Sequence, residues 1–180
     1  RPGMIGSASN PRSQGVHAVI SAIMTRARQR SLPNHRDDDF KIALVIEGGG
    51  MRGVVSGGMV SGLEALGLLP CFDLVIGSSA GVCAGAYFLA GQAEYGTRIY
   101  FEDINNRNFI DFLRPLRGRA VVDIDYLIDE VMKKVKPLDG DAVLETGIPF
   151  LILCTDIEDG SCYVARRFDG RDAILEAMRA

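Results

Sequence analysis

The sequence predicts an α/β protein in which helices cover both faces of a mostly parallel sheet, giving three layers. Two apolar runs, residues 41–46 and 72–76, have the length and composition of buried strands. Each run leads directly into a glycine-rich turn and then into a helix-forming segment. Strands that alternate with helices favour parallel pairing through crossover connections, and a continuous apolar run suits a strand covered on both faces.

The main domain is expected over residues 41–180, after an N-terminal segment over residues 1–40. Residues 1–15 are rich in Gly, Ser, Asn, Pro and Arg, which predicts a disordered arm. Residues 16–30 have apolar side chains at helical spacing and cations in the last turn, among them Arg26. We expect this helix to pack on the domain, although a basic amphipathic helix can also lie on a membrane. A polar linker then leads to the first strand.

Further elements follow along the chain. Residues 54–66 predict a helix that Gly67 ends as a left-handed cap. Its stripe of Met59, Leu63 and Leu66 is typical of core packing. The other expected elements are a mixed, partly loop segment at 101–122, a helix at 125–136, a strand at 148–157, its hairpin partner at 161–166 and a helix at 169–180. The last helix has no stop signal at Ala180, so we expect the domain to be truncated there on its C-terminal side.

The composition is that of an ordinary soluble globular protein. The chain has 180 residues, 47% of them hydrophobic, and a net charge of −3, which argues against a nucleic-acid-binding protein. No apolar run reaches the roughly 18 residues of a membrane span, and no signal-peptide core is present. Four cysteines without C-x-x-C spacing and only two histidines argue against a zinc site.

The cysteines indicate a cytoplasmic protein. Cys154 and Cys162 flank an expected two-residue hairpin turn at residues 159–160, which would place them on opposite faces of the ribbon. A disulfide between them is therefore disfavoured, and reduced thiols are typical of the cytosol. Peripheral contact with a membrane remains open for such a protein.

A nucleophile elbow is the most informative motif. Gly77-Ser78-Ser79-Ala80-Gly81 has the pattern G-x-S-x-G and lies between a predicted strand and a predicted helix. The central serine of this pattern, Ser79, is the candidate nucleophile, and its neighbour Ser78 is not. Gly77 and Gly81 allow strand and helix to approach without a clashing Cβ.

A glycine-rich loop after the first strand provides candidate oxyanion donors. Gly48-Gly49-Gly50-Met51-Arg52-Gly53 opens a helix, where backbone N–H groups can converge on a negative oxygen. The N–H group of Ala80 can supply another donor.

The base is harder to identify. His17 and His35 both precede the first core strand, and no histidine follows Ser79. An upstream histidine is not forbidden by chain order, but a linker histidine has no rigid element to position it. A carboxylate that acts directly on the serine hydroxyl fits better.

The order strand, G-G-G-x-R-G, helix, strand, G-x-S-x-G, helix resembles the patatin-like phospholipase family, and its bacterial members most. The resemblance runs from about Lys41 to the end of the chain and implies a lipid acyl hydrolase with a serine–aspartate dyad and no metal or organic cofactor. It makes Ser79 the nucleophile, the loop glycines at 48–50 the oxyanion hole, and Arg52 its orienting residue. Glu47 stands where many members have aspartate.

The family's Asp-Gly-Gly or Asp-Gly-Ala motif is missing. Asp139, Asp159 and Asp169 precede glycines, but the next residues are Asp, Ser and Arg. We expect these aspartates to form turns, the dyad aspartate to lie beyond Ala180, and the fragment alone to be inactive.

Other interpretations are weaker but stay open. Gly48-x-Gly50-x-x-Gly53 also fits a dinucleotide fingerprint, but the acidic residue that should end the second strand is absent. A patatin-like module that binds lipid or a partner without turnover is the main alternative. Cys83 is expected to be core, Asp156 to bond the hairpin backbone, and the arginines at 107, 114, 117 and 119 to form a solvated loop in preference to a head-group site.

Overall fold

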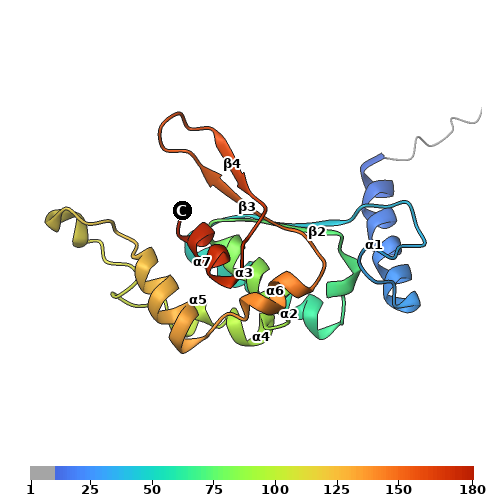
Figure 1. Cartoon of the computed structure of the whole chain (residues 1–180), viewed down its shortest axis with the longest axis horizontal. Helices are drawn as coiled ribbons and strands as arrows, with labels where there is room; N and C mark the ends of the chain where they lie inside the picture. The colour runs from blue at the N-terminus through green and yellow to red at the C-terminus, as the bar shows by residue number, and fades with distance from the viewer. Residues whose placement is uncertain (1–10) are drawn as a thin grey trace, which may run out of the picture.

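A four-stranded sheet in the order β1-β2-β3-β4 organises the computed structural model, which describes the backbone of residues 11–180 and side chains from residue 18 onward (Figure 1). The strands are β1 (Ala43–Ile46), β2 (Leu74–Ser78), β3 (Phe150–Thr155) and β4 (Cys162–Ala165). The first three are parallel, and β4 pairs antiparallel to β3. The predicted α/β class with a mostly parallel sheet is confirmed. Residues 11–15 of the expected disordered arm are helical instead, and the rest of that arm lies outside the described residues.

The register aligns the carboxyl ends of the three parallel strands. Gly77 of β2 pairs with Ile46 of β1 and with Ile152 of β3. Parallel strands all end at the same edge of a sheet, so the residues that follow β1 and β2 meet there. These are the glycine loop and Ser79, the two motifs that the sequence singles out.

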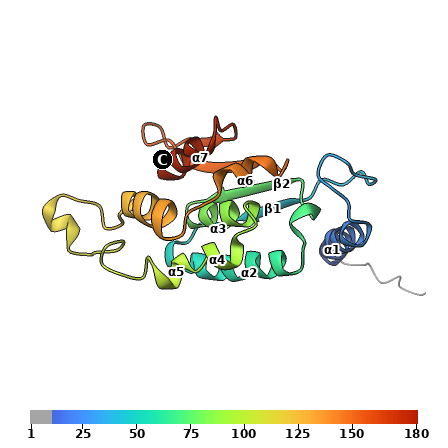
Figure 2. The ribbon, with the colours of Figure 1, turned by 60° about the horizontal axis from the view of Figure 1, so that its bottom comes forward.

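Helix α3 (Ala80–Leu89) is the centre of the core. Residues 81–89 are all buried, and Gly85 lies against Phe150, Val75 and Ile46 of the three parallel strands. Around α3 lie α2 (Gly53–Ala65), α4 (Ala93–Gly96), α5 (Ile99–Glu102), α6 (Gly140–Glu145) and α7 (Arg171–Arg179). Figures 1 and 2 show α2, α3 and α4 on one side of the sheet.

The opposite face of the sheet stays open across residues 11–180. Val45 in β1 is 65% exposed, although its neighbour Ile46 on the helical face is 5% exposed. The prediction that both faces of β1 are buried is therefore wrong. Residues 11–180 supply one of the two helical layers of the expected three-layer arrangement. Met59 of α2 and Leu66, the residue after it, are 66% and 72% exposed, so only Leu63 of the expected core stripe packs against the core.

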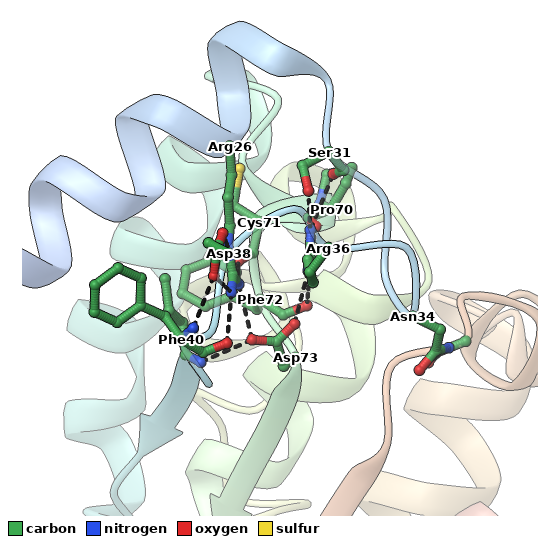
Figure 3. Close-up of polar contacts among 12 residues, drawn as sticks. Arg26, Ser31, Asn34, Arg36, Asp38, Phe40, Pro70, Cys71, Phe72 and Asp73 are labelled. Atoms are coloured by element: carbon green, nitrogen blue, oxygen red, sulfur yellow. Dashed lines mark hydrogen bonds and ion pairs between the residues drawn. The ribbon is translucent and has the colours of Figure 1, made fainter.

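The N-terminal helix α1 (Pro11–Gln29) packs at the end of the sheet where β1 and β2 begin. Its Arg26 has no exposed surface, and its guanidinium group donates five hydrogen bonds at 2.7–2.8 Å (Figure 3). The acceptors are both carboxylate oxygens of Asp38, one of Asp73, and the carbonyls of Phe40 and Cys71. The prediction that this helix packs on the domain is confirmed. Arg26 is not a surface cation, because its side chain is buried and fully hydrogen-bonded.

Asp73, immediately before β2, joins this network to a second arginine. Its second carboxylate oxygen accepts a hydrogen bond from Arg36 Nε at 2.8 Å, and the first also accepts one from the N–H of Ile42. Arg36 in turn donates to the carbonyls of Ser31, Pro70 and Phe72 (Figure 3). Burial raises the pKa of Asp73, but its hydrogen bonds outweigh burial and hold the pKa below the usual value.

Two other elements differ from expectation. The helix expected over residues 125–136 is present, but Tyr126–Val135 have the wider turns of a π-helix. In the hairpin, Thr155 pairs with Cys162, so the connection is six residues long and not two. Cys154 and Cys162 still lie on opposite faces of the ribbon, and all four cysteines are free, as predicted.

Candidate active site

Ser79 occupies a strained backbone position between β2 and α3. Its φ of 48° and ψ of −125° are rare for a residue with a side chain, and such strain is concentrated at functional sites. The side chain is exposed, and its hydroxyl does not cap α3 although it stands at the N-cap position. The elbow therefore presents the hydroxyl outward, at the carboxyl edge of the sheet.

The two elbow glycines are required by close backbone approaches. A Cβ on Gly81 would lie 2.2 Å from the carbonyl oxygen of Ile46, and a Cβ on Gly77 would lie 2.8 Å from the Cα of Val82. Neither contact is compatible with a side chain, because the atoms that would clash belong to the main chain. The glycine positions of G-x-S-x-G thus let α3 start directly beneath the ends of β1 and β2.

The glycine-rich loop lies against the nucleophile. A Cβ on Gly48 would come within 2.9 Å of the Cβ of Ser79. Gly50 has a φ of 57° and opens the 3₁₀ turn Gly50–Arg52, whose first N–H groups have no partner within the turn. Ala80 begins α3, so its N–H group also lacks a partner within its helix. Unpaired N–H groups from two helix starts therefore flank Ser79, an arrangement that favours binding of an anion.

Arg52 and Gly53 hold the two helix starts in place. The N–H of Arg52 donates to the carbonyl of Gly49 at 3.1 Å, and the Arg52 side chain lies beside Gly49. A Cβ on Gly53 would lie 2.5 Å from the ring of Tyr100 and 2.9 Å from the Cβ of Ala80. Gly53 therefore serves close packing of α2 on the elbow, and the role of Arg52 as orienting residue remains a prediction.

Tyr100 is a site residue that the sequence analysis missed. Its hydroxyl donates a 2.6 Å hydrogen bond to the carbonyl of Ala80, and the residue is 2% exposed. Burial raises the pKa of this phenol well above its usual value, so the proton of the hydrogen bond is retained. Its neighbours in sequence are equally typical of core, and nothing in the local pattern distinguishes it from a packing aromatic.

An apolar cavity of about 390 Å³ opens beside the elbow and is within the usual size range of ligand pockets. Gly50, Ser79 and Ala80 line it at the elbow, its polar end, and Arg179 of α7 also lines it. The apolar wall includes Ile99, Ile104, Phe109, Leu127, Ile152 and Met178. Cys83 also lines the cavity, but burial raises the pKa of its thiol to about 12, which supports the prediction of a core residue.

Two of the three carboxylates with the Asp-Gly pattern are bound by backbone N–H groups of their own turn or helix. Asp159 accepts a hydrogen bond from the N–H of Ser161, and Asp139 caps α6 by accepting one from Ala142. Asp156 likewise accepts one from the N–H of Glu158 within the hairpin loop. Their expected roles in turns and caps are confirmed.

The linker histidine lies at the other end of the sheet. Its neighbour Arg36 is bound to Asp73, which precedes β2, whereas Ser79 follows that strand. A strand rises about 3.3 Å per residue, so roughly 20 Å separate these two ends. His35 is therefore poorly placed as a base for Ser79, and the side chain of His17 lies outside the described residues.

No group of three or more potential metal ligands occurs among the described residues. Every helix within residues 11–180 is too short or too polar to cross a bilayer.

A parallel sheet that carries a serine elbow, an adjoining glycine loop and an apolar cavity defines the α/β class that includes serine acyl hydrolases. Residues 44–177, well over half of the chain, match the family described as Patatin-like phospholipase. The chain belongs to this family, as its two glycine motifs predict.

Two related proteins give the extent of the similarity. The chain is 35% identical over 101 residues to the uncharacterized protein YjjU of Escherichia coli (strain K12), a match that covers 56% of this chain and 28% of that protein. The structure of human GIVD cytosolic phospholipase A2, in complex with a methyl gamma-linolenyl fluorophosphonate inhibitor and terbium chloride, matches with a TM-score of 0.42 and 17% identity, over 94% of this chain and 34% of that one. The chain thus corresponds to about a third or less of either relative.

Proposed function

We propose that the protein hydrolyses carboxylic esters of lipids, with Ser79 as its nucleophile. The observation that carries this proposal is the strained, exposed Ser79 at the polar end of an apolar cavity. Such a cavity suits an acyl chain, and the unpaired N–H groups at its polar end suit the oxygen of a reacting ester. Membership in a phospholipase family agrees with a lipid substrate.

In the proposed reaction, Ser79 Oγ attacks the acyl carbon while its proton passes to a carboxylate base. The N–H groups of Ala80 and of the loop at residues 48–50 bind the oxyanion that forms. The base returns the proton to the leaving alcohol, and water then hydrolyses the acyl-enzyme by the same steps in reverse. No metal or organic cofactor takes part in this scheme.

We further propose that the base is an aspartate outside these 180 residues. The support is that Asp139, Asp156 and Asp159 are already engaged by backbone N–H groups of their own turns and caps. The matched region is only 28% of YjjU, so a full-length protein of this kind leaves room for such a residue.

The experiment compares Ser79→Ala with its neighbour Ser78→Ala in the full-length protein. A fluorophosphonate probe should label the wild type and Ser78→Ala but not Ser79→Ala. Hydrolysis of a medium-chain p-nitrophenyl ester should fall to background in Ser79→Ala, a loss of up to about 10⁶-fold. Equal hydrolysis by wild type and Ser79→Ala would refute the proposal, and a wild type that neither reacts nor turns over would favour the non-catalytic lipid-binding alternative.

A further inference from the structure

A projecting arm formed by residues 111–120 extends away from the sheet, next to the candidate site. It lies in the long connection between β2 and β3 and forms the yellow segment at the far left of Figures 1 and 2. A short antiparallel bridge between Ile110 and Val122 closes its base. Arg114 reinforces this closure, because its guanidinium donates to the carbonyls of Phe109 and Asn108. The arm is therefore a closed loop with a defined base.

The tip of the arm exposes large apolar side chains. Phe112, Leu113 and Leu116 are 80%, 59% and 84% exposed. Single exposed apolar residues are common, but three within five positions on a projecting loop form a patch of the kind that marks an interaction surface. The ribbon of the arm projects away from the sheet and the helices (Figure 2), and these exposed side chains add little to the core.

Positive charge surrounds this patch on a protein that is negative overall. The chain has a net charge of −3, whereas the arm contains three arginines and one aspartate. Arg117 is exposed, and the side chain of Arg119 is 69% exposed, with a distant ion-pair contact to Asp123 at 3.6 Å. Exposed arginines beside exposed Phe and Leu are the combination that binds an anionic membrane surface.

The base of the arm also forms part of the cavity beside Ser79. Phe109, Ile110, Val122 and Ile124 line the cavity directly below the bridge. An apolar surface therefore continues from the arm into the wall of the site. A lipid bound at the arm would lie next to this apolar wall.

We propose that the arm is a membrane-docking element that places an anionic lipid surface at the mouth of the cavity. Phe112, Leu113 and Leu116 enter the interfacial region, while Arg117 and Arg119 contact anionic head groups. The proposal rests on the proposed lipid hydrolase function for its purpose, but docking itself needs no catalysis. Of the four arginines that the sequence assigns to a solvated loop, Arg114 thus closes the arm, and Arg117 and Arg119 bind lipid.

The test measures sedimentation of the full-length protein with phosphatidylcholine vesicles, with and without phosphatidylglycerol. Wild type is expected to bind the anionic vesicles more tightly. The variants R117Q/R119Q and F112S/L116S should each lower affinity for them by about tenfold or more. The matched controls are R166Q/R167Q, which removes two exposed charges elsewhere, and L66S, which removes a leucine that is 72% exposed. Circular dichroism verifies that each variant is folded.

Three results overturn the proposal: arm variants that bind as wild type does, controls that lose as much affinity as the arm variants, or a wild type indifferent to phosphatidylglycerol. Catalysis is tested separately from docking. Ser79→Ala is expected to bind vesicles as wild type does, and the arm variants are expected to hydrolyse a soluble short-chain ester normally but a vesicle ester slowly. Vesicle binding without any esterase activity would support docking and refute only the proposed function.

Discussion

Replacement of Arg26 by methionine should test how strongly the N-terminal helix is tied to the sheet. Methionine keeps the length of the side chain but removes the guanidinium that supplies all five hydrogen bonds to Asp38, Asp73 and two carbonyls. Removing one partner of a buried ion network typically costs about 3–5 kcal/mol, because the remaining charges and carbonyls stay buried without compensation. For a protein of this size we expect the midpoint of thermal unfolding to fall by about 6–20 °C.

The assay is urea unfolding followed by circular dichroism, with two reference variants. Arg28→Met changes an exposed arginine on the same helix and should alter the free energy of unfolding by less than about 0.5 kcal/mol. Arg26→Lys retains the charge but has only three donors, so its free energy of unfolding should lie between those of wild type and Arg26→Met. A loss in Arg26→Met no greater than that in Arg28→Met would refute the reasoning, because the network would then contribute nothing to stability.

Two further predictions concern stability. Gly81→Ala should destabilise the protein by about 1–3 kcal/mol or more, because its Cβ would lie 2.2 Å from the Ile46 carbonyl. Gly62→Ala, on the open face of α2, should stabilise the protein by about 0.5–1 kcal/mol. Equal urea midpoints for the two variants would contradict the geometry. The hydrogen bond from Arg26 lowers the pKa of Asp38 to about 2, so its contribution is complete above the unfolded pKa of about 3.9 and is lost as the pH falls from about 4 toward 2. Urea midpoints across this pH range should fall less steeply in Arg26→Met than in wild type. Parallel plots of midpoint against pH for the two proteins would contradict this prediction.

The elbow and the glycine loop were predictable because their determinants are local. Although Gly81 is required by the Ile46 carbonyl of β1, the positive φ at Ser79 and the missing side chain at Gly77 are demands of a single turn between a strand and a helix. The same holds for Gly67, which ends α2 with a φ of 67° as predicted. A short segment of sequence contains all the information that such features need.

Features that depend on distant contacts were not predictable. Arg26 has the same local context as Arg28, and only the folded chain brings Asp38 and Asp73 to the one and leaves the other exposed. Tyr100 likewise gains its role from the carbonyl of Ala80, which lies 20 positions earlier in the chain. The periodicity of apolar residues indicates which face of a helix is buried, but it does not identify the residues that this face contacts.

The hairpin illustrates a case between these two. Its existence and the alternation of faces follow from a period of two, so the separation of Cys154 from Cys162 was correct. The turn length was wrong, because the loop is held by hydrogen bonds from Ser161 and Glu158 to Asp159 and Asp156, which extend it beyond a two-residue turn. Such a shift by an even number of residues leaves the faces unchanged.

The strand order has a consequence for the sequence of folding events. Residues of β1 pair with β2 31 positions later, whereas Val75 of β2 pairs with Phe150, 75 positions later. Closing the longer loop adds less than about 1 kcal/mol of entropy, but pairings this distant in sequence form slowly. Because β3 supports β2 up to Ser78, the turn at Ser79 acquires its full support only when this last closure is made. A nascent chain would thus hold Ser79 in its strained turn only after β3 has paired with β2.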